Sequence, residues 1–170
     1  MTALSPIKSN FSSKEEKPMK VYQIFLDGID KTGKDLIRSY IYYLGKARYI
    51  CVARGIMSMR VYAKLYDRPY AYDDECQKNV LNVLLEVDEE DWKIRCKTTN
   101  ETLTDYAKEK KMFEEEANML IKNHCNVILF NTSRNTPYDI SKNIVAFANK
   151  LNNDAKAMYI LKWMAYNISK

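Results

Sequence analysis

The amino-acid sequence predicts an α/β protein in which about four parallel strands are flanked by helices in three layers. Two observations lead to this fold class. Short β-favouring runs alternate along the chain with longer runs of helical periodicity, a pattern typical of parallel sheets with right-handed crossovers. A glycine-containing loop also joins the first expected strand directly to the first expected helix. With 170 residues, the chain is long enough for one domain with a sizeable core.

We expect this single domain to span residues 19–170, preceded by a flexible tail at residues 1–18. The tail is rich in Ser, Lys, Glu and Pro and has little to bury. It lacks the apolar centre of a signal peptide, and no run approaches the ~20 apolar residues of a membrane span, so we expect no membrane partner. The four cysteines are far apart and there is one histidine, which predicts reduced thiols in the cytoplasm and no Cys/His zinc site.

The most informative stretch, residues 21–37, reads VYQIFLDGIDKTGKDLI. Its first six residues favour a buried strand, and Gly28 and Gly33 then give the phosphate-loop spacing G-x-x-x-x-G-K, ending at Lys34. Such a loop exposes successive backbone N–H groups to an anion, and the following helix N-terminus adds partial positive charge. The alternative is a tight glycine turn in an ordinary βα unit. The residues predicted to bind the nucleotide cofactor are Gly28, Ile29, Asp30, Lys31, Thr32, Gly33, Lys34 and Asp35.

Three more elements are expected in the first half of the chain. The first helix has apolar residues at helical spacing and should end at Gly45, in a C′ position. The strand at 48–52 is short, apolar and β-branched, and the helix at 56–67 ends before Pro69. Arg54 lies between them, at the carboxyl edge of the expected sheet, where ligands of parallel sheets bind.

The second half of the chain alternates in the same way. Asp88 is expected to cap one helix, Thr136 is expected to cap another with Pro137 in its first turn, and the polar segment 97–100 is a candidate lid. The expected elements are strands at 80–87 and 126–130, and helices at 89–97, 103–123, 137–151 and 155–169, the last of them amphipathic.

Three blocks in this order resemble the thymidylate kinase and deoxynucleoside monophosphate kinase family, in particular its short viral members. Residues 25–35 read FLDGIDKTGKD, similar to F-E-G-x-D-x-x-G-K-[ST]. Residues 52–68 read VARGIMSMRVYAKLYDR, similar to D-R-G-x-x-S-x-x-V-Y-x-x-x-x-x-R. Residues 84–101 read LLEVDEEDWKIRCKTTNE, similar to a strand, an acidic helix start and a lid arginine. The likeness covers about residues 20–151 and implies a three-layer P-loop kinase fold.

The family transfers a phosphoryl group from ATP, with Mg²⁺, to a nucleoside monophosphate. The resemblance therefore implies a nucleotide as the main partner and a cytoplasmic location, which is the host cytoplasm if the protein is viral. By position, the implied catalytic residues are Lys34, Arg54 and Arg95. The implied contacts to the acceptor come from Asp30, Arg54, Ser58 and Tyr62.

Three departures from the family pattern affect the metal and the acceptor. Asp35 stands where the family has Ser or Thr, which makes it the candidate metal ligand, and Ala53 replaces the Asp before Arg54. A carboxylate about 4 Å from a phosphate costs on the order of 1–4 kcal/mol unless a metal lies between them. A strand and helix that the family has after the first helix are also missing.

Three functions remain open on these grounds. The first is an active nucleotide kinase, and the second is a catalytically degenerate kinase fold that serves as a nucleotide-binding or protein-interaction module. The third is a kinase that acts on a modified base within DNA, a weakly supported nucleic-acid partner. A homo-oligomer or protein partner would contact the C-terminal helix or the N-terminal tail.

Overall fold

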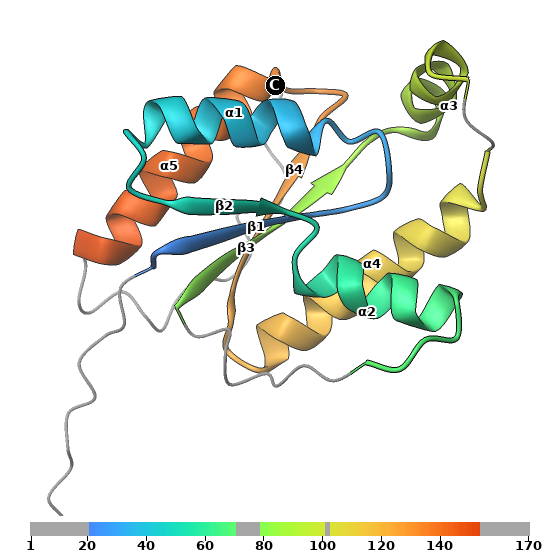
Figure 1. The fold of residues 1–170 in the computed structure, drawn as a ribbon, viewed down its shortest axis with the longest axis horizontal. Coiled ribbons are helices and arrows are strands. Elements are labelled where there is room, and N and C mark those ends of the chain that lie inside the picture. Colours follow the sequence, from blue (N-terminus) through green and yellow to red (C-terminus); the bar gives the residue numbers. More distant parts are fainter. Residues whose placement is uncertain (1–20, 71–78, 101–102, 154–170) are drawn as a thin grey trace, which may run out of the picture.

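The sheet consists of four parallel strands in the order β2-β1-β3-β4, and helices cover both of its faces (Figure 1). The computed structural model describes residues 21–70, 79–100 and 103–153. The strands are β1 (Gln23–Asp27), β2 (Ile50–Ala53), β3 (Val80–Glu86) and β4 (Asn126–Asn131). This three-layer α/β architecture confirms the predicted fold class and is consistent with a P-loop-like fold.

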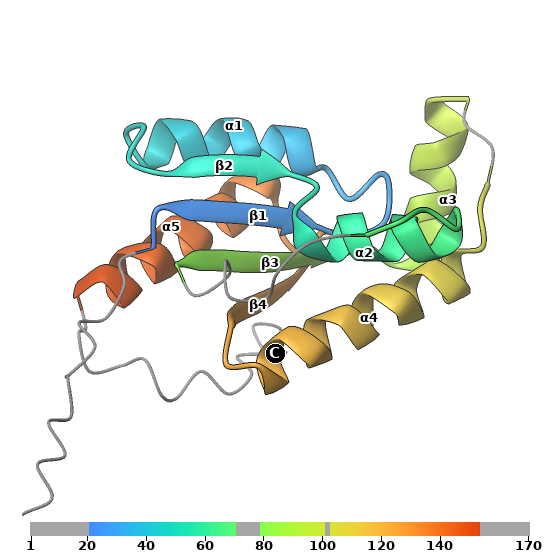
Figure 2. The same cartoon turned by 60° about the horizontal axis from the view of Figure 1, so that its bottom comes forward.

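The five helices of the described residues fall into two pairs and one separate helix (Figures 1 and 2). Helices α1 (Lys34–Leu44) and α5 (Pro137–Asn153) pack on one face of the sheet, and α2 (Ile56–Leu65) and α4 (Tyr106–Lys122) pack on the other. Helix α3 (Glu89–Thr98) stands beyond the carboxyl ends of the strands.

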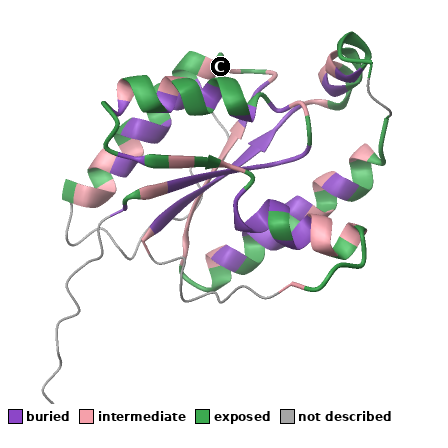
Figure 3. Ribbon diagram, in the orientation of Figure 1, coloured by how far each residue is buried: buried purple, intermediate pink, exposed green. Residues whose placement is uncertain are grey.

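Burial follows the position of each strand in the sheet (Figure 3). Every residue of β3 is buried, because this strand has neighbours on both sides and helices on both faces. The edge strand β2 instead alternates between exposed and half-buried residues, and Ile50 is 62% exposed. The carboxyl ends of β1 and β3 therefore meet at a rigid, buried edge, which positions the loops that follow them.

The prediction that Gly45 occupies a left-handed C′ position is wrong. The helix α1 does end there, but Gly45 has φ −75°, and the left-handed residues are Lys46 and Ala47. Glycine is required for space instead, because a Cβ atom at this position would lie 2.8 Å from the carbonyl oxygen of Ile41 and 3.1 Å from the ring of Tyr49.

One of the two predicted helix caps is confirmed, and the other is wrong. Thr136 accepts a hydrogen bond from the backbone N–H of Asp139 at 3.1 Å, as expected of a cap. Asp88 precedes α3 but makes no capping hydrogen bond, because its Oδ1 accepts from the side chain of Asn131 at 2.8 Å. Helix α4 begins three residues later than predicted, because Asp105 caps it by accepting from Lys108 N–H at 3.1 Å.

Some predictions fall on residues outside those described. These are the tail at 1–18 and the last helix at 155–169. Within the described ranges, no helix is long and apolar enough to cross a membrane. The cysteines among the described residues, Cys51, Cys96 and Cys125, are free thiols.

Candidate functional site

The glycine loop between β1 and α1 lies at the carboxyl edge of the sheet, next to the end of β3. Gly28 has φ 135°, and a Cβ atom on it would lie 2.1 Å from the carbonyl oxygen of Leu85, so only glycine fits against β3. Gly33 has φ 79° and Lys31 has φ 68°, two further left-handed residues that curl the loop. The sequence predicted the positions of both glycines in the loop correctly, because the spacing G-x-x-x-x-G-K is typical of a curled loop.

The backbone N–H groups of this loop are available to a ligand. Among the described residues, no hydrogen bond is donated by the N–H groups of Ile29, Asp30, Thr32 or Gly33. Helix α1 begins at Lys34 and adds its own first-turn N–H groups and its partial positive charge. A curled loop of unengaged amides at a helix N-terminus is a structure that binds anions.

The Lys34 ammonium lies inside this loop. It donates to the carbonyl oxygens of Gly28 at 2.8 Å and Ile29 at 2.7 Å, and to Thr32 Oγ1 at 3.1 Å. All three of its donors are thus satisfied by the loop itself. Burial lowers the pKa of Lys34 from 10.5 to about 8, so the side chain is still mostly charged at pH 7. A bound phosphate oxygen would take the place of one of these acceptors.

Arg54 faces the same loop from the end of β2. Its backbone has φ 73°, a left-handed conformation that is strained for a side-chain-bearing residue, and its N–H donates to Leu26 O at 2.8 Å. Its guanidinium donates to Asp30 Oδ1 at 3.1 Å and lies 5.6 Å from the centre of the Tyr62 ring. The structure thus brings together Asp30, Arg54 and Tyr62, all of which the sequence predicted to form one site.

Beneath them is a buried carboxylate that the sequence reasoning did not single out. Asp27 ends β1 with 0% exposure, and its Oδ1 accepts from the backbone N–H of Ser58, at the start of α2, at 2.8 Å. Within the described residues, Asp27 Oδ2, the Ser58 hydroxyl and the Tyr62 hydroxyl complete no well-formed hydrogen bond. Burial raises the pKa of the Asp27 carboxyl, while hydrogen bonds from Ser58 oppose the rise. The sequence did contain a signal for Asp27: it is an acidic residue at the carboxyl end of the first parallel strand.

Arg95, from α3, is held against the other side of the loop. Its Nη1 donates to the carbonyl oxygen of Lys31 at 2.9 Å and to Thr132 Oγ1 at 2.9 Å, and its Nη2 donates to Thr132 O at 3.0 Å. Thr132, which follows β4, was not predicted, because a lone Thr after a strand carries no sequence signal. Arg95 therefore joins the site through the loop backbone.

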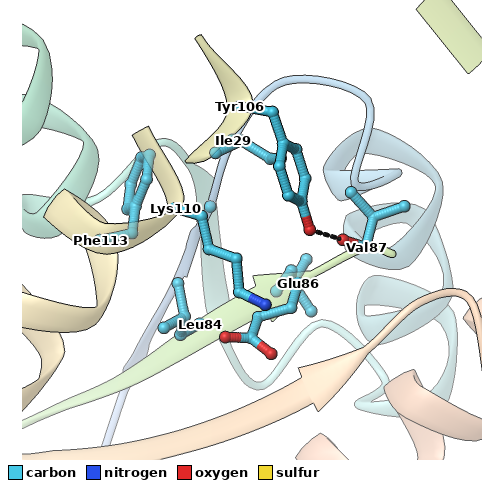
Figure 4. A pocket seen from close by; sticks show the side chains of 9 residues that line it. Ile29, Leu84, Glu86, Val87, Tyr106, Lys110 and Phe113 are labelled. Atoms are coloured by element: carbon cyan, nitrogen blue, oxygen red, sulfur yellow. Dashed lines mark hydrogen bonds between the residues drawn. The ribbon is translucent and has the colours of Figure 1, made fainter. Parts of the chain in front are cut away.

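A small, partly open cavity lies between the loop, β3 and α4 (Figure 4). Its volume is about 10 Å³, room for one water molecule at most. The Lys110 ammonium points toward the Glu86 carboxylate across it, and the Tyr106 hydroxyl donates to Val87 O at 2.6 Å. Burial raises the pKa of Glu86, and Lys110 opposes the rise. A nucleotide is too large for this cavity.

The residues present fit phosphate groups but not the metal site that the family resemblance implies. The Asp35 side chain is 84% exposed and pairs with Arg38 at 3.1 Å, and Ala53 offers no ligand atom. Within the described ranges, no three Asp, Glu, Cys or His side chains are grouped to hold a metal ion. We therefore derive no step through Mg²⁺.

Comparison with known proteins does not assign the chain to a family. No protein-family model matches it, and no curated protein sequence matches it significantly.

Proposed function

We propose that this chain is a P-loop nucleotide kinase-like protein. In this proposal, the loop at 28–34 binds the phosphates of ATP, and a nucleoside monophosphate binds beside it, against Asp30, Arg54, Ser58 and Tyr62. The observation that supports the proposal most is that one loop combines unengaged backbone amides with the buried Lys34 ammonium. An ordinary glycine turn needs neither feature.

The proposed chemistry is transfer of the terminal phosphoryl group to a phosphate oxygen of the acceptor. Such transfer depends mainly on positioning and on positive charge around the moving group. Lys34 would supply charge from within the loop, and Arg54, oriented by Asp30 and the Tyr62 ring, would supply it from the acceptor side. The unsatisfied atoms of Asp27, Ser58 and Tyr62 are buried beneath this surface, so an acceptor would reach them only after the side chains above them move.

Incubating the full chain with ATP, Mg²⁺ and each deoxynucleoside monophosphate in turn tests the proposal. We expect ADP and the matching diphosphate to form, as resolved by ion-exchange chromatography. Lys34→Ala is the control for contaminating kinases, because it removes the charge at the loop. ADP formation no greater than that of Lys34→Ala with every acceptor would reject the kinase activity.

Two substitutions toward the family pattern provide a second test. Asp35→Thr supplies the hydroxyl and Ala53→Asp supplies the carboxylate that the family uses for the metal. We expect the double variant to turn over faster than the natural chain. If the double variant binds ATP but is no faster, the family chemistry does not operate on this scaffold.

The second candidate function is a nucleotide-binding or protein-interaction module without turnover. It is favoured by the exposed, Arg38-paired Asp35 and by the absence of a ligand atom at Ala53. Titration calorimetry with ATP and ADP separates the candidates. Tight binding without turnover supports the binding module, and absence of binding leaves only the protein-interaction role.

A further inference from the structure

We propose that Arg95 is a positioning residue for the glycine loop at 28–34. It orients the Thr32 amide and does not itself contact phosphate. The inference rests on the proposed phosphate binding by the loop and deepens it. It differs from the role that the family resemblance implies, in which the lid arginine contacts the transferred group.

The peptide unit between Lys31 and Thr32 connects Arg95 to a loop amide. In a trans peptide, the C=O of one residue and the N–H of the next point in opposite directions within one plane. Arg95 Nη1 donates to the Lys31 carbonyl oxygen at 2.9 Å and holds it on the α3 side of the loop. The Thr32 N–H must then point to the opposite side of this peptide, away from Arg95. This N–H donates no hydrogen bond to any described residue.

Arg95 is itself firmly anchored. It donates twice to Thr132, through Nη1 to Oγ1 at 2.9 Å and through Nη2 to the carbonyl oxygen at 3.0 Å. Thr132 in turn donates to the carbonyl oxygen of Glu86 from both its backbone N–H, at 2.8 Å, and its hydroxyl, at 3.0 Å. Glu86 ends the buried central strand β3. A continuous chain of hydrogen bonds thus connects the rigid sheet to the Lys31–Thr32 peptide.

The loop needs such a support. Lys31 has φ 68°, a left-handed conformation that a lysine adopts only when its surroundings hold it there. Without the bond from Arg95, the Lys31 carbonyl oxygen loses a partner that fixes the plane of the Lys31–Thr32 peptide, and the Thr32 N–H becomes less well oriented. Both N–H groups of Nη1 are already used by Lys31 O and Thr132 Oγ1, so this nitrogen could contact a phosphate only by giving up one of those bonds.

The experiment measures pyrophosphate binding to the full chain by calorimetry, together with the NMR order parameter of the Thr32 amide without ligand. The variants are Arg95→Ala, Arg95→Lys and Thr132→Val, and the matched control is Thr98→Val. Thr98 is an exposed threonine on α3, the helix that also carries Arg95. Its hydroxyl donates only to Ile94 O, within that helix. Thr132→Val removes the hydroxyl that anchors Arg95 without touching Arg95 itself.

We expect Arg95→Ala to weaken pyrophosphate binding about tenfold, because the loop loses the charge-assisted hydrogen bond that orients one of its amides. The Thr32 order parameter should fall below 0.6, the range of a flexible amide. Thr132→Val should shift both quantities in the same direction by less, Arg95→Lys should restore part of the loss, and Thr98→Val should change neither.

Three results would overturn the inference. In the first, Arg95→Ala weakens binding while the Thr32 order parameter and the Thr132→Val variant stay unchanged, which indicates direct phosphate contact. In the second, order parameters in β3 fall as much as that of Thr32, which indicates general loosening. In the third, neither Arg95→Ala nor Thr132→Val changes the order parameter of the Thr32 amide. If the natural chain fails to bind pyrophosphate, the proposed function is rejected, and the order parameter alone still decides the role of Arg95.

Discussion

Asp27 combines complete burial with a carboxylate oxygen that has no hydrogen-bond partner among the described residues. Burial disfavours the charged form and raises the pKa of this carboxyl above the ordinary value of 3.8. The folded chain therefore holds this proton at a pH where the unfolded chain has already released it. By linkage, stability falls as the pH rises from about 3.8 through the pKa of the folded state. A buried carboxyl with a raised pKa at the edge of a sheet is a candidate for a functional residue.

Asp27→Asn tests this cost. The amide retains an oxygen for the Ser58 N–H but removes the buried charge, so we expect the variant to be more stable than the natural chain at pH 7. The gain should shrink as the pH falls and vanish below about 3.8, where both chains are neutral at this position. Urea unfolding across this pH range measures it, with Glu115→Gln on the surface of α4 as the control. A gain that does not depend on pH contradicts the assignment.

At the scale of elements, the unit formed by β1, the loop and α1 depends on its two glycines for different reasons. Gly28 touches the backbone of β3, where a Cβ atom would meet Leu85 O at 2.1 Å. Gly33 has no atom within 4 Å of such a Cβ, and it requires only a left-handed backbone with φ 79°. The first glycine therefore joins the loop to the sheet, whereas the second shapes the start of α1.

This difference predicts unequal effects of the same substitution. Gly28→Ala must push the loop away from β3, and we expect a loss of about 3 kcal/mol or more in the free energy of unfolding. Gly33→Ala should cost about 1–2 kcal/mol, the cost of a left-handed alanine. Urea denaturation of both variants compares them directly. Equal losses would mean that the contact with Leu85 does not decide the need for glycine at position 28.

At the scale of the whole molecule, the sheet separates two apolar clusters, and the α2–α4 side also contains a buried charge network. Glu116 of α4 is 1% exposed and accepts from Lys64 at 2.5 Å and from Arg60 at 3.4 Å, both on α2. Arg60 also donates to the Tyr70 hydroxyl at 2.9 Å. These contacts fix α2 against α4, and Ser58 and Tyr62 of the candidate site lie on α2.

Removing Glu116 should therefore affect the whole fold. Glu116→Ala leaves the buried Arg60 guanidinium without its carboxylate, and we expect a loss of about 3–5 kcal/mol. The neighbouring Glu115 is 62% exposed and lies 4.0 Å from Lys111, so Glu115→Ala should cost less than about 1 kcal/mol. Chemical unfolding of the two variants is the measurement. Similar losses for both would show that the network does not hold α2 against α4.

The sequence by itself determined the fold class, the order of the elements and the place of the glycine loop between β1 and α1. These features are encoded locally: periodicity reports which side of each segment is buried, and the spacing of Gly28 and Gly33 reports the curl between β1 and α1. It also placed Arg54 at the carboxyl edge of the sheet, where ligands of parallel sheets bind. Asp30, Ser58 and Tyr62 were grouped with it only through the family resemblance. Their chemical roles stay predictions.

Only the tertiary structure decided which groups are bonded to one another. Arg95 meets Lys31 across 64 positions of the chain, and Asp27 meets Ser58 across 31. Asp88 gives its carboxylate to Asn131 instead of capping its helix, and Thr132 becomes part of the site through its bonds to Arg95 and Glu86. Local patterns specify the conformation of a segment, but partners of side chains depend on strand register and helix packing, which exist only once distant segments have come together.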